Sequence, residues 1–233
     1  MLWNYMNRVF TVCLLLLLAC SESTIEPDFQ RTGEEYFPLE VGNYSIYNVE
    51  SIEFDILGTI DTAVFQLKSE VVDSFASQNG EITYIIHRHT RNTENDPWEF
   101  QSAWSAYLNA NQAVLIEENT PFLKITFPIE NDRQWDGNRL NTLEQDDYVL
   151  DSLGSAYIAP NDTIENTLTI IQSDNQDFII QQDKRVEIYG LDIGLVYKQS
   201  LLLSYCAEQI CIGLEEIESG FSYTQKLVEY GEN

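Results

Sequence analysis

Hydrophobic and polar residues alternate with a period of two along much of the chain. The run Tyr44–Val49 alternates in this way, as do the longer runs Ala63–Val72 and Glu81–Thr90. Successive side chains of a β-strand point to opposite faces, so each run predicts a strand. Asn79-Gly80 is a strong hairpin-turn signal and lies between the last two runs, which are therefore expected to pair as antiparallel neighbours.

Shorter apolar or alternating runs continue to the end of the chain, separated by Gly, Asn and Asp turn signals. They are Ala113–Glu117, Phe122–Phe127, Thr167–Gln172, Asp177–Gln182, Lys184–Tyr189, Ile193–Tyr205 and Ser222–Tyr230. The aromatic stretch Trp98–Leu108 fits either a strand or a short helix, and Trp135–Asn138 resembles a turn that packs a tryptophan. No segment has a long helical period.

About ten to twelve short strands are therefore expected. They predict an all-β or β-rich α+β fold with few short helices. Its sheet would be antiparallel and strongly curved, as a half-barrel, a barrel or a sandwich. Residues 35–233 show no internal repeat and no interdomain linker, so we expect one β-rich domain.

The first 20 residues have the pattern of an export signal. Arg8 precedes the apolar run Val9–Ala19, which only Thr11 interrupts. The run is shorter than the roughly 20 apolar residues of a membrane-spanning helix and has the size of a signal-peptide core. It ends in Leu17-Leu18-Ala19-Cys20. The alternatives are a plain signal peptide and an N-terminal membrane helix.

That ending resembles the lipobox of bacterial lipoproteins. The resemblance implies that residues 1–19 are a lipoprotein signal peptide and that Cys20 is lipidated on its thiol and becomes the new N-terminus. Two or more acyl chains, such as palmitate, hold a protein durably on a membrane. Residues 20–34 are polar and acidic, with Pro27 and Gly33, and are expected to form a flexible tether.

The mature chain is also similar to a group of uncharacterised Gram-negative envelope lipoproteins, which begin with a lipobox and a Phe-Pro-Leu-x-x-Gly entry strand. Tyr44 stands where that group usually has Trp. The resemblance implies a location in the cell envelope, most specifically at the outer membrane, and a single domain. It implies no activity. The segments that carry it are Tyr36–Leu39, Val41–Tyr44, Phe127-Pro128, Trp135–Gly137, Gly194–Lys198 and Gly220–Tyr223.

The chain is strongly acidic, with 38 Asp and Glu against 12 Lys and Arg and a net charge of −26. Nucleic-acid binding depends on neutralising phosphates, so a nucleic-acid partner is not expected. Electrostatic docking on anionic lipid is equally disfavoured, which leaves the N-terminal lipid to hold the protein at the membrane. Such charge usually serves solubility.

Two cysteines besides Cys20 remain after the signal. Cys206 and Cys211 flank four residues, and thiols outside the cytoplasm tend to oxidise. We predict a disulfide between them. The alternatives are two buried free thiols, a metal site that lacks obvious partner ligands, and a redox pair with unusual spacing.

Other candidate chemistry is weak. His87 and His89 share one strand face and could begin a metal site, but no third ligand is evident nearby. The acidic clusters do not match a calcium-binding loop, and Asx residues in loops usually form turns. These clusters are Glu144–Asp147, Asn161-Asp162 and Asp174–Asp177.

The sequence contains no Gly-x-Ser-x-Gly elbow and no phosphate-binding glycine loop. We therefore expect no catalytic residue, no cofactor and no resident metal. We also expect that the protein is not an enzyme. Trp98, Trp104 and Trp135 are expected to be core, with a sugar or lipid site as the alternative. The prediction is a lipid-anchored binding or envelope-assembly module. The alternatives are a carrier of an apolar ligand in a curled sheet and a carboxylate-based glycan hydrolase.

Overall fold

The computed structural model describes residues 32–77, 80–160 and 162–233. In this part of the chain, twelve strands follow one short 3-10 turn, η1 (Glu34–Tyr36). The first six strands are β1 (Asn43–Phe54), β2 (Ile60–Ala76), β3 (Ile82–Arg91), β4 (Glu99–Asn109), β5 (Gln112–Glu117) and β6 (Thr120–Thr126). The other six are β7 (Gln134–Asp136), β8 (Asp147–Ile158), β9 (Thr163–Asp177), β10 (Gln181–Gly190), β11 (Gly194–Tyr205) and β12 (Ile217–Glu232).

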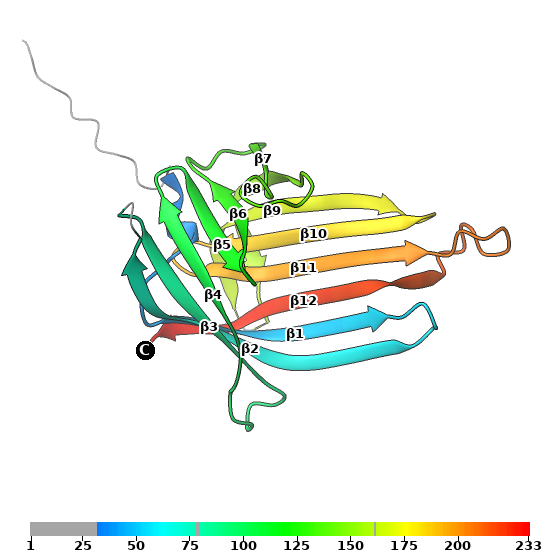
Figure 1. Cartoon of the computed structure of the whole chain (residues 1–233), viewed down its shortest axis with the longest axis horizontal. Helices are drawn as coiled ribbons and strands as arrows, with labels where there is room; N and C mark the ends of the chain where they lie inside the picture. The colour runs from blue at the N-terminus through cyan, green and yellow to red at the C-terminus, as the bar shows by residue number, and fades with distance from the viewer. Residues whose placement is uncertain (1–31, 78–79, 161) are drawn as a thin grey trace, which may run out of the picture.

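All twelve strands belong to one antiparallel sheet, in the order β6-β5-β4-β3-β2-β1-β12-β11-β10-β9-β8-β7. Strands that are neighbours in the sequence pair with each other, except β6 and β7, which form the two edges of the sheet, and β1 pairs with β12 at its centre. The sheet therefore has an N-terminal half, β1 to β6, and a C-terminal half, β7 to β12. In Figure 1, β3 to β6 cross in front of the long strands of the other half.

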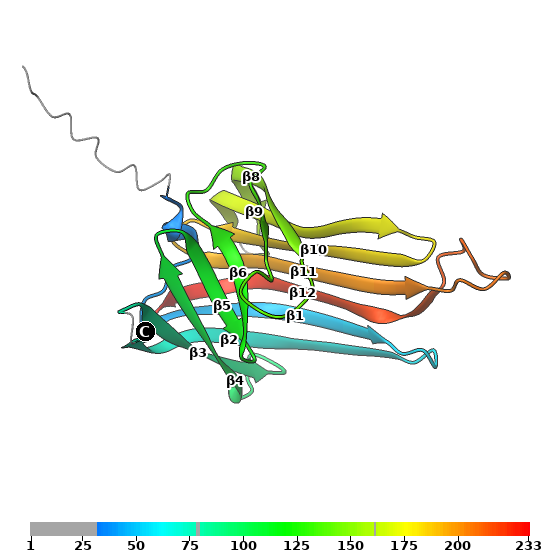
Figure 2. The ribbon, with the colours of Figure 1, turned by 45° about the horizontal axis from the view of Figure 1, so that its top comes forward.

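The sheet curves until it is nearly closed into a barrel, as the second view also shows (Figure 2). Its edge strands, β6 and β7, approach each other at the end of that curve. The backbone amide of Leu123 donates to the carbonyl of Gly137 at 2.9 Å. The buried Trp135 indole donates to the carbonyl of Leu123 at 3.0 Å. These bonds connect the two halves across the seam between the edges.

The main hydrophobic core lies inside the curve. It combines side chains from both halves, including Ile86, Leu123, Leu150 and Ile170. The segment before β1 adds Tyr36, Phe37 and Leu39, which are all buried in this core. The segment before β1 therefore packs against the inner face of the sheet. It begins so close to this face that a Cβ on Gly33 would collide with Ile129.

The predicted fold class is confirmed: the sheet is antiparallel, strongly curved and almost free of helix. The predicted pairing of Ala63–Val72 with Glu81–Thr90 is also confirmed, as β2 with β3. All of Trp98–Leu108 except Trp98 belongs to the strand β4. Two predictions fail, because Asp177–Gln182 is mainly the β9–β10 turn and the long strand β8 was not foreseen.

Candidate functional site: a charged cavity inside the curved sheet

A cavity of about 700 Å³ lies inside the curve, between the two halves of the sheet. Its volume is within the range of about 300–1,000 Å³ that is usual for small-molecule sites. Strands of both halves and the segment before β1 line it. Its apolar walls include Phe37, Leu39, Val71, Ile86, Trp104 and Leu115.

Charged side chains also face this cavity, because strand alternation places them on the inner face with the core residues. Lys124 on β6 contacts Glu187 on β10 at 2.9 Å and Glu117 on β5 at 3.2 Å. Lys198 on β11 lies 3.3 Å from Glu187. Lys124 therefore joins an edge strand of one half to the other half across the interior.

Glu187 is the most enclosed member of this network, with 1% of its surface exposed. One of its oxygens accepts a hydrogen bond of 2.6 Å from the Tyr189 hydroxyl. Burial alone would raise the pKa of Glu187, but Lys124 and Lys198 outweigh burial and lower the pKa to about 2. The same balance lowers the pKa of Glu117. Both carboxylates are therefore ionised at neutral pH.

Lys124 experiences the converse balance. Burial disfavours its charged form, but the attraction of Glu187 and Glu117 is stronger and raises its pKa. Burial and the neighbouring Glu187 raise the pKa of Tyr189. Tyr189 therefore stays protonated and acts as a hydrogen-bond donor to Glu187. At neutral pH the network therefore holds the charged Glu117, Glu187 and Lys124 beside a neutral Tyr189.

Arg88 on β3 is the third cation of the cavity lining. Its guanidinium carbon lies 3.7 Å from the centre of the Trp104 ring, a cation–π contact. It also hydrogen-bonds to Tyr223, whose hydroxyl donates to Gln225 at 2.8 Å. Burial lowers the pKa of Arg88. Within the described residues, no carboxylate forms an ion pair with it.

None of these charged residues was predicted from the sequence to belong to a site. Arg88 lies between His87 and His89 on β3, but unlike them it lines the cavity. Lys124 had a usable signal, since it is the one charged residue in the apolar run Phe122–Phe127. A charge in such a run is rarely buried without a partner.

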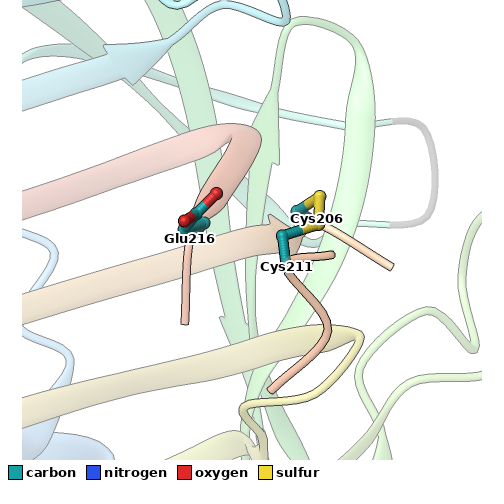
Figure 3. Close-up of side chains that lie close together, drawn as sticks. All are labelled: Cys206, Cys211 and Glu216. Atoms are coloured by element: carbon teal, nitrogen blue, oxygen red, sulfur yellow. A yellow bond between two sulfur atoms is a disulfide. The ribbon is translucent and has the colours of Figure 1, made fainter. Parts of the chain in front are cut away.

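Cys206 and Cys211 form a disulfide in the structure, with their Cα atoms 5.8 Å apart. They lie in the β11–β12 loop, away from the cavity lining, and Glu216 is close to both (Figure 3). Bonded sulfurs offer no thiolate, so this cluster lacks the ligands that zinc prefers. Cys20, the predicted lipidation site, lies outside the described residues.

His87 and His89 lie side by side, with ring centroids 6.1 Å apart, and both contact Phe100. In the described ranges, neither belongs to a group of three metal-binding side chains. The acidic clusters mainly make local bonds. Asp177, for example, accepts a hydrogen bond from the amide of Ile179 in the following turn. Asp146 is the exception, since its two carboxylate oxygens accept hydrogen bonds of 2.7 and 2.9 Å from the distant Arg185 guanidinium.

The three tryptophans have different roles. Trp135 is buried, as predicted for a core residue. Trp104 lines the cavity, which fits the alternative of a ligand site. Trp98 stacks under Arg91 at 4.2 Å, away from the cavity. The described chain contains no helix with the length and hydropathy of a membrane span.

Comparison with known proteins gives little further information. No family model matches the sequence, and no significant match was found among curated proteins. A candidate lipoprotein from Parabacteroides distasonis has a TM-score of 0.42 and 10% identity, covering 84% of this chain and 98% of that one. A candidate exported protein with a YmcC-like fold from Bacteroides fragilis has a TM-score of 0.44 and 8% identity, with the same coverage. Such values establish no activity for this chain.

Proposed function

We propose that this chain is a lipid-anchored protein of the bacterial cell envelope that binds a small amphiphilic molecule inside its curved sheet. The observation that carries the binding role is the cavity of about 700 Å³, which has both apolar walls and fixed charges. The lipobox-like Leu17–Cys20 sequence supports the anchoring and an outer-membrane address.

The anchor has a direct test. Replacing Cys20 with Ala should abolish incorporation of a fatty-acid probe and leave the precursor uncut, because the thiol is the acceptor of the lipid. Labelling is measured after growth with an alkyne-tagged palmitate. Cys206→Ala is the matched control and should keep its label. Persistent labelling of the Cys20→Ala chain would contradict the anchor.

A binding role fits the cavity better than hydrolysis does. A glycoside hydrolase needs one carboxyl group with a raised pKa to act as the acid. In the cavity network Glu117 and Glu187 both contact Lys124, and both have lowered pKa values. Neither can donate a proton near neutral pH, so this pair supports a binding site.

The binding role is tested by filling the cavity. The mature chain from Ser21 onward, which contains every strand of the described sheet, is exported without its lipid and studied by native mass spectrometry. We expect one bound amphiphile per chain. Ser69→Phe, which projects into the cavity from β2, should abolish this binding.

Val64→Phe is the control for bulk on the same strand, since Val64 is 66% exposed and outside the cavity lining. It should leave binding unchanged. If the wild-type chain binds no member of a panel of acyl acids, alcohols and amines, the proposed function is wrong. Unchanged binding in Ser69→Phe would place the ligand elsewhere and would also contradict it.

A second candidate function is attachment of an envelope protein at the tips of the β1–β2, β9–β10 and β11–β12 hairpins. We call the exposed apolar residues at these tips the hairpin-tip patch. The three turns lie at the same end of the sheet (Figure 1). Large exposed apolar groups of this kind often mark interaction sites. The exposed residues are Ile56, Leu57, Ile60, Phe178, Ile179, Ile180, Ile210, Ile212 and Leu214.

This attachment is tested by placing a photo-crosslinking amino acid at position 57 in living cells. We expect one dominant cross-linked protein, which Ile210→Ser and Ile212→Ser together should remove. The same cross-linker at position 50, on the exposed Glu50 of β1, is the control. Identical cross-linking from both positions would contradict a specific role of the patch.

A further inference from the structure

We propose that the ligand of the cavity carries one anionic group, that Arg88 binds this group, and that the ligand class is therefore a long-chain amphiphile with a single acid. This inference rests on the proposed cavity-binding function and specifies its ligand. It begins from the charged side chains that line the cavity.

Among these charges, one cation has no ion-pair partner in the described residues. The three cations are Lys124, Lys198 and Arg88, and the two carboxylates in contact with cations are Glu117 and Glu187. Both lysines have their carboxylate partners within 3.3 Å. Arg88 is the remaining cation. A half-buried cation without an ion pair stands out in a chain with 38 acidic and 12 basic residues.

Other acids line the cavity but do not neutralise Arg88. Glu117 is near enough to favour the charged form of Arg88, yet the ion pair of Glu117 is with Lys124. Asp192 and Glu232 contribute to the lining beside the segment that precedes β1 and the end of β12. In the described structure, neither forms an ion pair with Arg88.

The contacts that Arg88 does make leave binding capacity free. The Trp104 ring covers one face of the guanidinium, and the Tyr223 oxygen accepts a hydrogen bond from it. A guanidinium has five N–H donors arranged in its plane, and stacking does not use them. The geometry suits a planar acid group that accepts two of these donors.

The surroundings of Arg88 fit the rest of an amphiphile. Ile86 lies two residues earlier on the same inner face of β3, and it pairs with Trp104 on β4. Val71, Leu115 and Leu39 continue the apolar lining. An acyl chain could occupy this region while its acid reaches Arg88, so one molecule would satisfy both the apolar walls and the spare charge.

The test compares palmitate with hexadecanol, which has the same chain length and no charge. Their binding to the unlipidated mature chain is followed by tryptophan fluorescence, to which Trp104 contributes, and by calorimetry below the aggregation limit. Palmitate should bind at least about tenfold tighter, the usual effect of one charge-assisted hydrogen bond. This comparison needs no variant.

Arg88→Gln should then remove the preference for palmitate and leave hexadecanol binding unchanged. Arg91→Gln is the matched control, since Arg91 lies on the same strand and also stacks on a tryptophan, but outside the cavity lining. Its preference should match the wild type. Thermal unfolding checks that each variant is folded, and Arg88→Lys, which keeps the charge, serves if Arg88→Gln does not fold.

The outcomes separate the two proposals. Equal binding of palmitate and hexadecanol by the wild-type chain would overturn the acid-recognition inference and leave the binding function standing. A preference that survives in Arg88→Gln, or that disappears equally in Arg91→Gln, would also overturn it. Failure to bind either compound, or any other member of the amphiphile panel, would overturn both.

Discussion

Lys124 is at the centre of the buried charge network and has 4% of its surface exposed. Its Nζ atom contacts carboxylates from two different strands, Glu117 at 3.2 Å and Glu187 at 2.9 Å. Such pairs add little net stability compared with apolar packing, but removing one partner leaves a buried charge uncompensated. The lysine is therefore hard to replace by itself.

Lys124→Met should reduce the free energy of unfolding by about 3 to 5 kcal/mol, because Glu117 and Glu187 would lose their shared cation. Urea unfolding followed by circular dichroism measures the loss. Lys68→Met is the control, since Lys68 pairs with Glu70 in a more accessible setting, and should cost about 1 kcal/mol or less. A similar small effect for Lys124→Met would contradict the role of the network.

The network also predicts a pH dependence. The folded-state pKa of Glu187 is about 2, below its ordinary value, so its contribution to stability is present above the ordinary pKa and lost as pH falls towards 2. Stability should decline by about 2 to 3 kcal/mol from this residue between roughly pH 5 and pH 2. Urea midpoints at several pH values measure the decline.

Glu187→Gln cannot titrate at this position and should show a shallower decline over the same range. An identical pH profile in the variant and the wild type would show that other carboxylates control acid unfolding. The raised pKa of Lys124 gives no loss in this range, because its contribution disappears only as pH rises above its folded pKa.

Single residues could be predicted only where the sequence carries a local signal. The core position of Trp135 follows from its turn-like surroundings and its size. The role of Arg88 does not follow from the sequence. A bulge between Arg88 and His89 and the pairing of β3 with β4 determine which residues lie opposite Arg88. The sequence distance between Lys124 and Glu187 is 63 residues, so no local pattern connects them.

At the level of strands, the period-two pattern predicted most of the sheet. It failed for β8, where three register shifts against β9 and the exposed Asp151, Gly154 and Ser155 weaken the alternation. It also failed at Phe178–Ile180, an apolar run that resembles a strand but forms an exposed turn. Apolar composition there reflects the hairpin-tip patch rather than strand pairing.

The Cys206–Cys211 disulfide closes a loop between β11 and β12 with a sequence separation of 5. A loop this short restrains the unfolded chain only modestly, so reduction should cost about 2 kcal/mol. Urea unfolding with and without reductant measures the loss, and a Cys206→Ser, Cys211→Ser chain should match the reduced protein. Loss of all β-sheet signal on reduction would contradict this estimate, since the ladder between the two strands lies outside the loop.

For the whole molecule, the sequence predicted an antiparallel curved sheet but not which of three forms it takes. Half-barrel, barrel and sandwich share the same alternation of inward and outward residues. Contacts between distant segments decide the form. Here these are the β6–β7 seam and the bridge from Lys124 to Glu187, and neither has a sequence signature that fixes its partner.

The central pairing of β1 with β12 gives a prediction for the complete chain. Truncation after Ser219 removes most of β12 and leaves β1 and β11 without a shared neighbour. The shortened chain should lose its cooperative unfolding transition, as measured by near-ultraviolet circular dichroism in urea. Removing Asn233 alone should preserve the transition, and a cooperative transition in the longer truncation would contradict the central role of β12.

The same pairing determines when the molecule can fold. A growing polypeptide makes β1 first, but the strand that completes the middle of the sheet ends at Glu232, next to the last residue. Contacts between such distant segments form slowly, because a long loop must close before they are made. The finished sheet therefore has to wait until β12 has been synthesised. That delay suits the envelope location that we propose, because such a chain would cross a membrane unfolded before it adopts its native form.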